Sequence, residues 1–172
     1  KRHLMETETN SKINYNKGDF VVYPAHGVGH VLGLENQKIG DTNIDLVVVR
    51  FDQERMTLRI PLSKAANSGL RKLSSKQQMD KAISILKTKA KAKKLMWSRR
   101  AQEYETKINS GNLALIAEVV RDLHKEDQAD QSYSERQMYQ SALERLAGEF
   151  AAIEDIDKSS AQTKLSELLN VA

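Results

Sequence analysis

The segment from Lys89 to Arg100 carries the residues whose chemistry is easiest to name. The only tryptophan, Trp97, lies there among lysine and arginine side chains. Cationic side chains neutralise phosphate charge, and a flat apolar ring can wedge against a distorted base step. This combination is typical of proteins that grip a nucleic-acid backbone, so the segment predicts polyanion binding.

Trp97 also has a purely structural interpretation. Trp97, Ala101, Tyr104 and Ile108 recur at the spacing of one helical face. The indole would then belong to the core of a helix bundle. Spacing alone favours this core position over the wedge.

Charge is distributed unevenly along the chain, although the formal net charge is only +4. The window from Arg71 to Arg100 contains eleven Lys/Arg and one acid, Asp80. The window from Glu118 to Asp157 contains eleven Asp/Glu and four Lys/Arg. Such a division favours an oriented electrostatic contact through the middle of the chain. The alternative is a lysine-rich helix face that is merely solvated.

Other groups that could do chemistry are few. His26 and His30 fall in a region that reads as strand, where they would share a face about 13 Å apart, too far for one metal ion. The Gly27–Gly29 segment lacks both a third glycine and a following helix, so we interpret it as a tight turn between strands. His124 is typical of a helix-end cap or a solvated residue. The sequence therefore predicts no catalytic residue, no metal site and no cofactor.

Composition narrows the class of protein further. The 172 residues include no cysteine, which excludes a disulfide scaffold and a cysteine nucleophile and fits a reducing compartment. No apolar run resembles a signal peptide or approaches the roughly 18 residues of a membrane span. We expect a cytoplasmic protein whose polar opening, residues 1–14, is disordered.

The elements before residue 70 are predicted to be short strands, at residues 19–23, 28–35, 45–51 and 57–61. They predict a small antiparallel sheet or barrel. In the last strand apolar residues alternate with polar ones, so Arg59 should project from the face opposite Leu58 and Ile60. There it is either available to a partner or an exposed charge that keeps a sheet edge soluble.

The pattern after residue 70 is helical. Ser74 and Gln77 form a possible capping box for a helix over 76–89, and a second helix is expected over 95–108. Asn112 is a predicted cap for a helix that ends near residue 123. Ser132 and Glu135 form a possible capping box before a long helix, and a short last helix is expected over 161–169.

Several motifs stand in one order along the chain: Gly18-Asp19, Val21-Val22-Tyr23-Pro24, His26-Gly27, Arg59-Ile60-Pro61, Trp97-Ser98-Arg99-Arg100 and Ala117-Glu118-Val119-Val120-Arg121-Asp122-Leu123. Together, over about residues 15 to 153, they resemble the CarD/CdnL family of bacterial transcription regulators. The amino-terminal strands also resemble the polymerase-binding module of transcription-repair coupling factors.

The resemblance implies an α+β fold and a regulator that is not an enzyme. A Tudor-like sheet domain, 15–70, would bind the β subunit of RNA polymerase. A helical domain, 71–158, would bind promoter DNA at the upstream edge of the transcription bubble, followed by a short helix or tail, 159–172. Trp97 would then wedge into the minor groove with weak sequence preference and stabilise the open complex at the nucleoid.

The polymerase contacts implied by the resemblance are Arg59 and a second basic position in a loop near Gln37 and Lys38. Gln37 occupies the aligned position, so this chain lacks the usual charge there.

The DNA contacts implied are Arg99, Arg100 and Arg136 around Trp97. Gln102 stands where many relatives have a lysine, and neighbouring lysines such as Lys94 are candidates to compensate. The alternative is an adaptor that binds polymerase or another protein without touching DNA, with Trp97 in the core. We expect a monomer, because no heptad seam or long unpaired apolar strand demands a partner.

Overall fold

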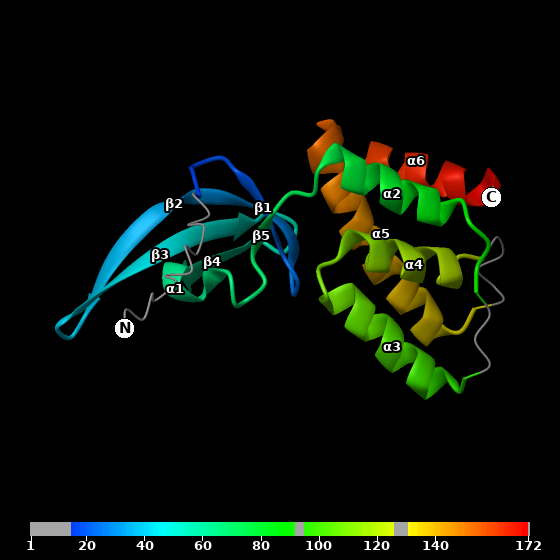
Figure 1. Ribbon diagram of the computed structural model, residues 1–172, viewed down its shortest axis with the longest axis horizontal. Coiled ribbons are helices and arrows are strands. Elements are labelled where there is room, and N and C mark those ends of the chain that lie inside the picture. The colour runs from blue at the N-terminus through cyan, green and yellow to red at the C-terminus, as the bar shows by residue number, and fades with distance from the viewer. Residues whose placement is uncertain (1–14, 92–94, 126–130, 172) are drawn as a thin grey trace, which may run out of the picture.

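The computed structural model describes residues 15–91, 95–125 and 131–171, and it separates a sheet from a bundle of helices (Figure 1). The chain has an α+β fold, as predicted. The strands are β1 (Phe20–Tyr23), β2 (Gly27–Ile39), β3 (Thr42–Phe51), β4 (Met56–Pro61) and β5 (Arg71–Lys72). They form one antiparallel sheet in the order β4-β3-β2-β1-β5, with β4 at one edge.

One face of the sheet is packed as a core. Val47 and Val49 of β3 are fully buried there and Ile60 of β4 joins them, because alternate residues of a strand point to the same face. Arg59 lies on the other face and is exposed, which confirms the predicted alternation. The core face is completed by α1 (Leu62–Ala65), a short helix that the sequence did not predict.

The turn between β1 and β2 lies earlier than predicted. Residues 24–26 make the turn, whereas Gly27–Gly29 is the start of β2, so the interpretation of these glycines as the turn was wrong. Gly29 is needed in the strand for packing. A Cβ at Gly29 would lie 2.8 Å from Phe51 Cε1, so the ring of Phe51 can rest against the backbone only if residue 29 has no side chain.

The hairpin formed by β2 and β3 is longer than predicted and projects beyond the rest of the sheet (Figure 1). Strand β4 pairs with residues 46–51 of β3, while β2 and β3 remain paired out to Ile39 and Thr42. Most residues of this extension are polar, and its Ile39 is exposed, because neither face of the extension needs to bury apolar side chains.

The helices after the sheet are α2 (Lys76–Leu86), α3 (Trp97–Asn109), α4 (Leu113–Leu123), α5 (Tyr133–Glu154) and α6 (Lys158–Val171). We call these five the helical module, and β1–β5 with α1 the sheet module. No helix within the described residues is long and apolar enough to cross a membrane.

The start of α2 differs from the prediction by one residue. Ser75 and Gln78 form the capping box, with both reciprocal hydrogen bonds present. Ser74 does not cap, because its N–H donates to Glu149 and its hydroxyl accepts from Arg71. The cap at Asn112 is confirmed, since its side chain accepts from the first-turn N–H groups of α4.

Both ends of the helical region also depart from the expected boundaries. The sheet continues two residues past the predicted limit at residue 70, because β5 pairs with β1. At the carboxyl end, α6 begins at Lys158 and is longer than the predicted helix over 161–169. It packs on the module through Ala161, Leu165 and Leu169, each almost fully buried.

Two arginines join the modules across their junction. Arg71 of β5 binds the buried carboxylate of Glu149 on α5 through both oxygens, with Nη2–Oε1 at 2.5 Å and Nη1–Oε2 at 3.1 Å. Arg145 of α5 donates to the backbone carbonyls of Pro24 and Ala25 in the turn after β1. Burial lowers the pKa of the Arg145 guanidinium, against the raising effect of nearby acids.

Candidate functional site

The amino-terminal tip of α3 holds the predicted wedge. Trp97 is the first residue of the helix and is partly buried, with its ring centroid 6.3 Å from that of Tyr104. Tyr104 and Ile108 are buried in the helical core, as the spacing predicts. Trp97 lies at the edge of that core, so its indole both packs inward and keeps a surface toward solvent.

Arg100 holds the indole in place. Its guanidinium carbon lies 5.7 Å from the ring centroids of both Trp97 and Tyr104, and Nη2 donates to the Tyr104 hydroxyl at 3.2 Å. A cation over an aromatic face attracts the ring. Arg99, by contrast, is exposed. The two arginines that the sequence treats alike therefore differ, because Arg100 supports Trp97 while Arg99 faces solvent.

The lysine-rich connection between α2 and α3 is fastened to α4. The buried carboxylate of Asp122 accepts from the backbone N–H of Lys91 at 3.1 Å and from Arg121 Nε at 2.9 Å. Arg121 also donates to the Thr88 hydroxyl at 2.9 Å. These bonds hold the connection, with its exposed Lys87, Lys89 and Lys91, against the carboxyl end of α4. Lys94, predicted to contact DNA, lies outside the described residues.

The first turns of α5 carry Arg136, which is exposed. Ser132 caps the helix by accepting from the N–H of Glu135, as predicted. The carboxylate of Glu135 lies 3.7 Å from Lys125 Nζ, so within the described residues only the serine half of the predicted capping box is present. The helices α3 and α5 begin at the same end of the helical module (Figure 1).

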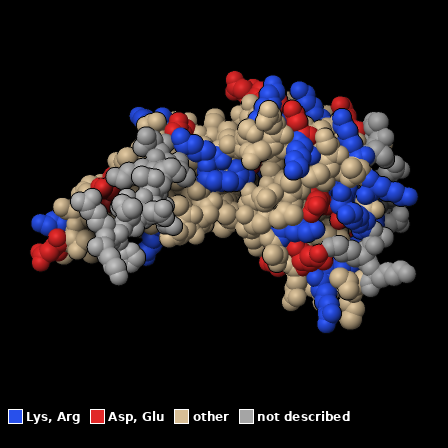
Figure 2. Space-filling model, in the orientation of Figure 1, with Lys and Arg blue, Asp and Glu red and all other residues tan. Residues whose placement is uncertain are grey.

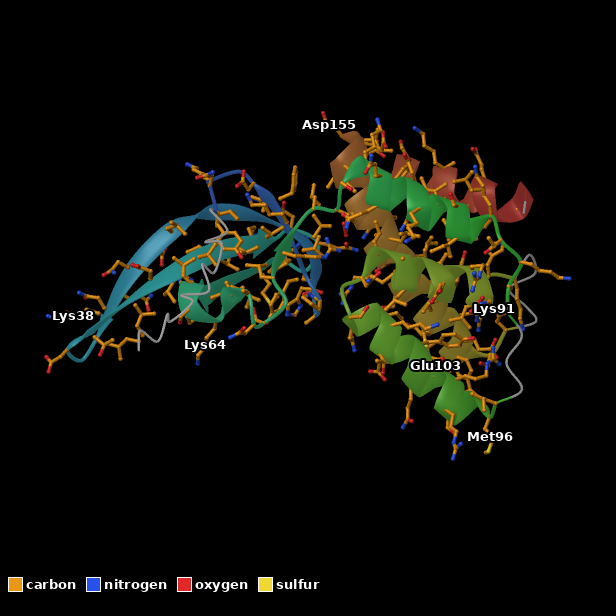
Figure 3. All side chains as sticks on the ribbon, viewed as in Figure 1. Lys38, Lys64, Lys91, Met96, Glu103 and Asp155 are labelled. Carbon is orange, nitrogen blue, oxygen red and sulfur yellow. The ribbon has the colours of Figure 1, made fainter. Side chains whose placement is uncertain are left out.

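Cationic side chains gather at the end of the helical module farthest from the sheet, with acidic side chains interspersed (Figure 2). Figure 3 places Lys91 and Met96 at this end and Lys38 at the opposite end of the molecule. We call the tip of α3 with the connection before it the α3 tip surface, which comprises Lys87, Lys89, Lys91, Leu95, Met96, Trp97, Arg99 and Arg100.

The predicted polymerase contact, Arg59, lies on the edge strand β4. Its Nε binds Glu35 Oε2 at 3.0 Å, and both side chains remain about half exposed. A β-bulge between Val31 and Gly33 shifts the register of β2 by one residue. This shift turns Glu35 to the face that carries Arg59, because a one-residue slip moves side chains to the other face of a sheet.

A shallow hollow of about 430 Å³ lies beside this ion pair. Its lining includes Leu32, Gly33 and Leu34 of β2, and the two leucines are exposed large apolar residues. Neither the leucines nor Glu35 was predicted from the sequence as a site residue. The bulge that sets the register of Glu35 is a property of strand pairing and leaves no clear signal in one strand read alone.

Gln37 and Lys38 were expected in a loop, and that expectation is wrong, because both are paired residues of β2 near the hairpin end. The loop itself is Gly40 and Asp41. Alternation puts Gln37 on the face of Glu35, about 7 Å farther along the strand, and Lys38 on the opposite face.

His26 and His30 each lie beside a separate acidic residue. His26 lies in the turn before β2 and its Nδ1 is 2.7 Å from Glu54, while His30 Nδ1 is 3.4 Å from Asp52. Within the described residues, no group of three or more His, Asp or Glu side chains is placed to hold a metal ion.

Comparison with known proteins matches both modules. The CarD-like/TRCF RID domain matches residues 15–74, and the CarD C-terminal domain matches residues 81–166. A protein of Bacillus subtilis (strain 168), described as "Putative transcription factor YdeB", is 30% identical over 140 residues. These cover 81% of this chain and 92% of that protein. The chain belongs to the CarD family.

The two matched regions of this CarD-family chain correspond to the two modules of the fold. The first ends just after β5, and the second begins within α2 and reaches into α6. The family is one of transcription factors, so the class of function is transcription regulation.

Proposed function

We propose that this CarD-family protein binds RNA polymerase through its sheet module and promoter DNA through the α3 tip surface, and so stabilises the open promoter complex. It would act in the cytoplasm, at the nucleoid. The observation that carries the proposal is the position of Trp97, partly exposed at a helix tip with Arg100 over its ring and exposed Arg99 in the same turn, within a chain of this family.

The separation of the two candidate surfaces supports two simultaneous contacts. The strands that carry Arg59 and Glu35, β4 and β2, lie in the sheet module at one end of the long axis, and the α3 tip lies toward the other end (Figure 1). The junction between the modules is held by Arg71, Glu149 and Arg145. A fixed junction lets a protein bound to polymerase at one end hold DNA at the other.

The contact with DNA would combine phosphate binding with wedging. Arg99 and the exposed lysines of the connection are placed to neutralise phosphates, which positions a protein without reading sequence. Trp97, held from behind by Arg100, would lie against the last base pair of the duplex. A ring at that position hinders reannealing, which lengthens the life of the melted state.

The contact with the β subunit of polymerase would centre on Arg59. Edge strand β4 presents unpaired backbone groups on one side, and Arg59, Glu35 and the adjoining hollow lie on one face. An edge strand beside exposed leucines and a charge is a common docking surface for another protein.

The adaptor alternative keeps one specific observation in its favour: Trp97 packs against Tyr104 and the helical core. In that case the α3 tip surface would either bind another protein or have no binding role, and it would not contact DNA.

A photo-crosslinking residue placed at Ser98 separates the two functions, because Ser98 is exposed and directly follows Trp97. In complexes of polymerase with a promoter, we expect crosslinks to DNA at the upstream edge of the bubble. The same residue at Lys164, exposed on α6, serves as the control. Crosslinks from position 98 to protein alone would favour the adaptor.

A further inference from the structure

Met96 is the most exposed large apolar side chain within the described residues, with 76% of its surface accessible. It directly precedes Trp97, and Leu95 before it is 47% exposed. The described part of the helical module has one further exposed large apolar side chain, Tyr133 at the start of α5. Apolar surface is therefore concentrated at the tip of α3, where Figure 3 shows Met96 projecting from the helix.

Neither capping nor packing accounts for a methionine at this position. Met96 is the N-cap of α3, where Ser, Thr, Asp or Asn would accept a first-turn N–H, and it makes no such bond. The caps of α2, α4 and α5 follow the usual preference, with Ser75, Asn112 and Ser132. Among the helices α2 to α5, only α3 breaks this local rule, and it does so with an exposed side chain. Such a break is typical of a position kept for binding.

The surroundings of Met96 indicate what covers it. Arg99, three residues after Met96, is exposed, and the amino-terminal end of α3 adds a partial positive charge. An apolar group with a cationic rim is complementary to nucleic acid in which a base face is uncovered beside phosphates.

We propose that Met96 is a second wedge residue, which packs on the base uncovered at the junction of duplex and melted DNA, ahead of the Trp97 ring. Trp97 is partly buried and fixed by Arg100, whereas Met96 projects freely and is flexible enough to follow a distorted step. This inference rests on the function proposed above, since it names a further residue of the same surface.

The test compares wild type, Met96→Ser and Met96→Leu in the full-length protein. We expect Met96→Ser to melt at the wild-type temperature or above, because serine can cap α3. It should also co-purify with polymerase normally yet shorten the open-complex lifetime about fivefold, since the apolar contact is lost. Met96→Leu keeps an apolar side chain of similar size and should retain the wild-type lifetime.

The outcomes separate this inference from the proposed function. If wild type lengthens the lifetime and Met96→Ser lengthens it equally, the role of Met96 is overturned while the proposed function stands. If wild type itself has no effect on the lifetime, the proposed function is overturned and the role of Met96 with it. A variant that is both more stable and less active cannot be explained by a structural role of the methionine.

Discussion

Arg71 and Glu149 form a bidentate ion pair across the junction of the two modules, with Nη2 and Oε1 2.5 Å apart. The Glu149 side chain is almost fully buried, and its Oε2 also accepts from the backbone N–H of Ser74. Arg71 Nε donates in turn to the Gly111 carbonyl before α4. One buried carboxylate thus ties together the end of the sheet, the segment just before α2 and the carboxyl-terminal part of α5.

Glu149→Gln should lower the free energy of unfolding by about 3 kcal/mol, because removing one charge of a buried pair leaves the other without compensation. Urea denaturation measures this change. The matched control is Glu144→Gln on the same helix, where the exposed side chain predicts a change within about 0.5 kcal/mol. Equal effects of the two substitutions would show that the junction pair adds no stability.

Arg59→Glu should abolish co-purification with RNA polymerase and leave the fold intact. The Arg59–Glu35 pair is half exposed, so its loss costs the fold only about 0 to 1 kcal/mol. Lys64→Glu makes the same reversal of charge on α1, which packs against the opposite face of the sheet, and should bind polymerase normally. Retained binding by a folded Arg59→Glu variant would refute the assignment.

Arg99→Gln should weaken binding to forked promoter DNA at every sequence and reduce the slope of log K against log salt by about 1, as expected for one lost phosphate contact. The slope is obtained by titrating the DNA at several salt concentrations. Lys164→Gln removes an exposed charge from α6 and should leave the slope unchanged. An unaltered slope for Arg99→Gln would exclude it as a phosphate contact.

Ionisation of the Tyr139 phenol should lower the stability of the helical module at alkaline pH. Its hydroxyl lies 2.9 Å from Nδ1 of His124, the C-cap of α4, and burial raises its pKa to about 12. The unfolded chain ionises its phenol near pH 10, so above that value protons leave the unfolded state first. The protonated Tyr139 hydroxyl therefore makes its full contribution to the free energy of unfolding below about pH 10. This contribution is lost as the pH rises to about 12.

Between pH 9 and pH 11, wild type should lose about 1 kcal/mol more unfolding free energy than Tyr139→Phe, which keeps the ring and cannot ionise. Urea denaturation at the two pH values gives the difference, and the titration of lysines cancels between the two proteins. Parallel losses would mean that Tyr139 ionises normally in the folded protein.

The sequence correctly predicted features that depend only on neighbouring residues. The alternation around Arg59, the cap at Asn112 and the helical face of Tyr104 and Ile108 all involve neighbours within a turn or a strand, and all are confirmed. Distant pairings were not predictable in this way. The bond from Ser74 to Glu149 joins residues 75 positions apart, and it moved the α2 cap by one residue.

The candidate site shows the same division. The sequence predicted Trp97, Arg99 and Arg100 as site residues, with the same role for both arginines. Their difference follows from the helical turn, which brings Arg100 over the rings of Trp97 and Tyr104 and leaves Arg99 in solvent. Met96 carries no motif, and only its exposure at an uncapped helix start marks it.

The lifetime of the open complex tests the central claim most directly. It would be measured on a promoter fragment with cognate RNA polymerase alone, with wild type and with Trp97→Ala, while polymerase binding is followed in parallel. We predict that wild type lengthens the lifetime and that Trp97→Ala binds polymerase but does not. If both proteins bind polymerase and Trp97→Ala lengthens the lifetime as much as wild type, or neither protein changes it, the wedge account is contradicted.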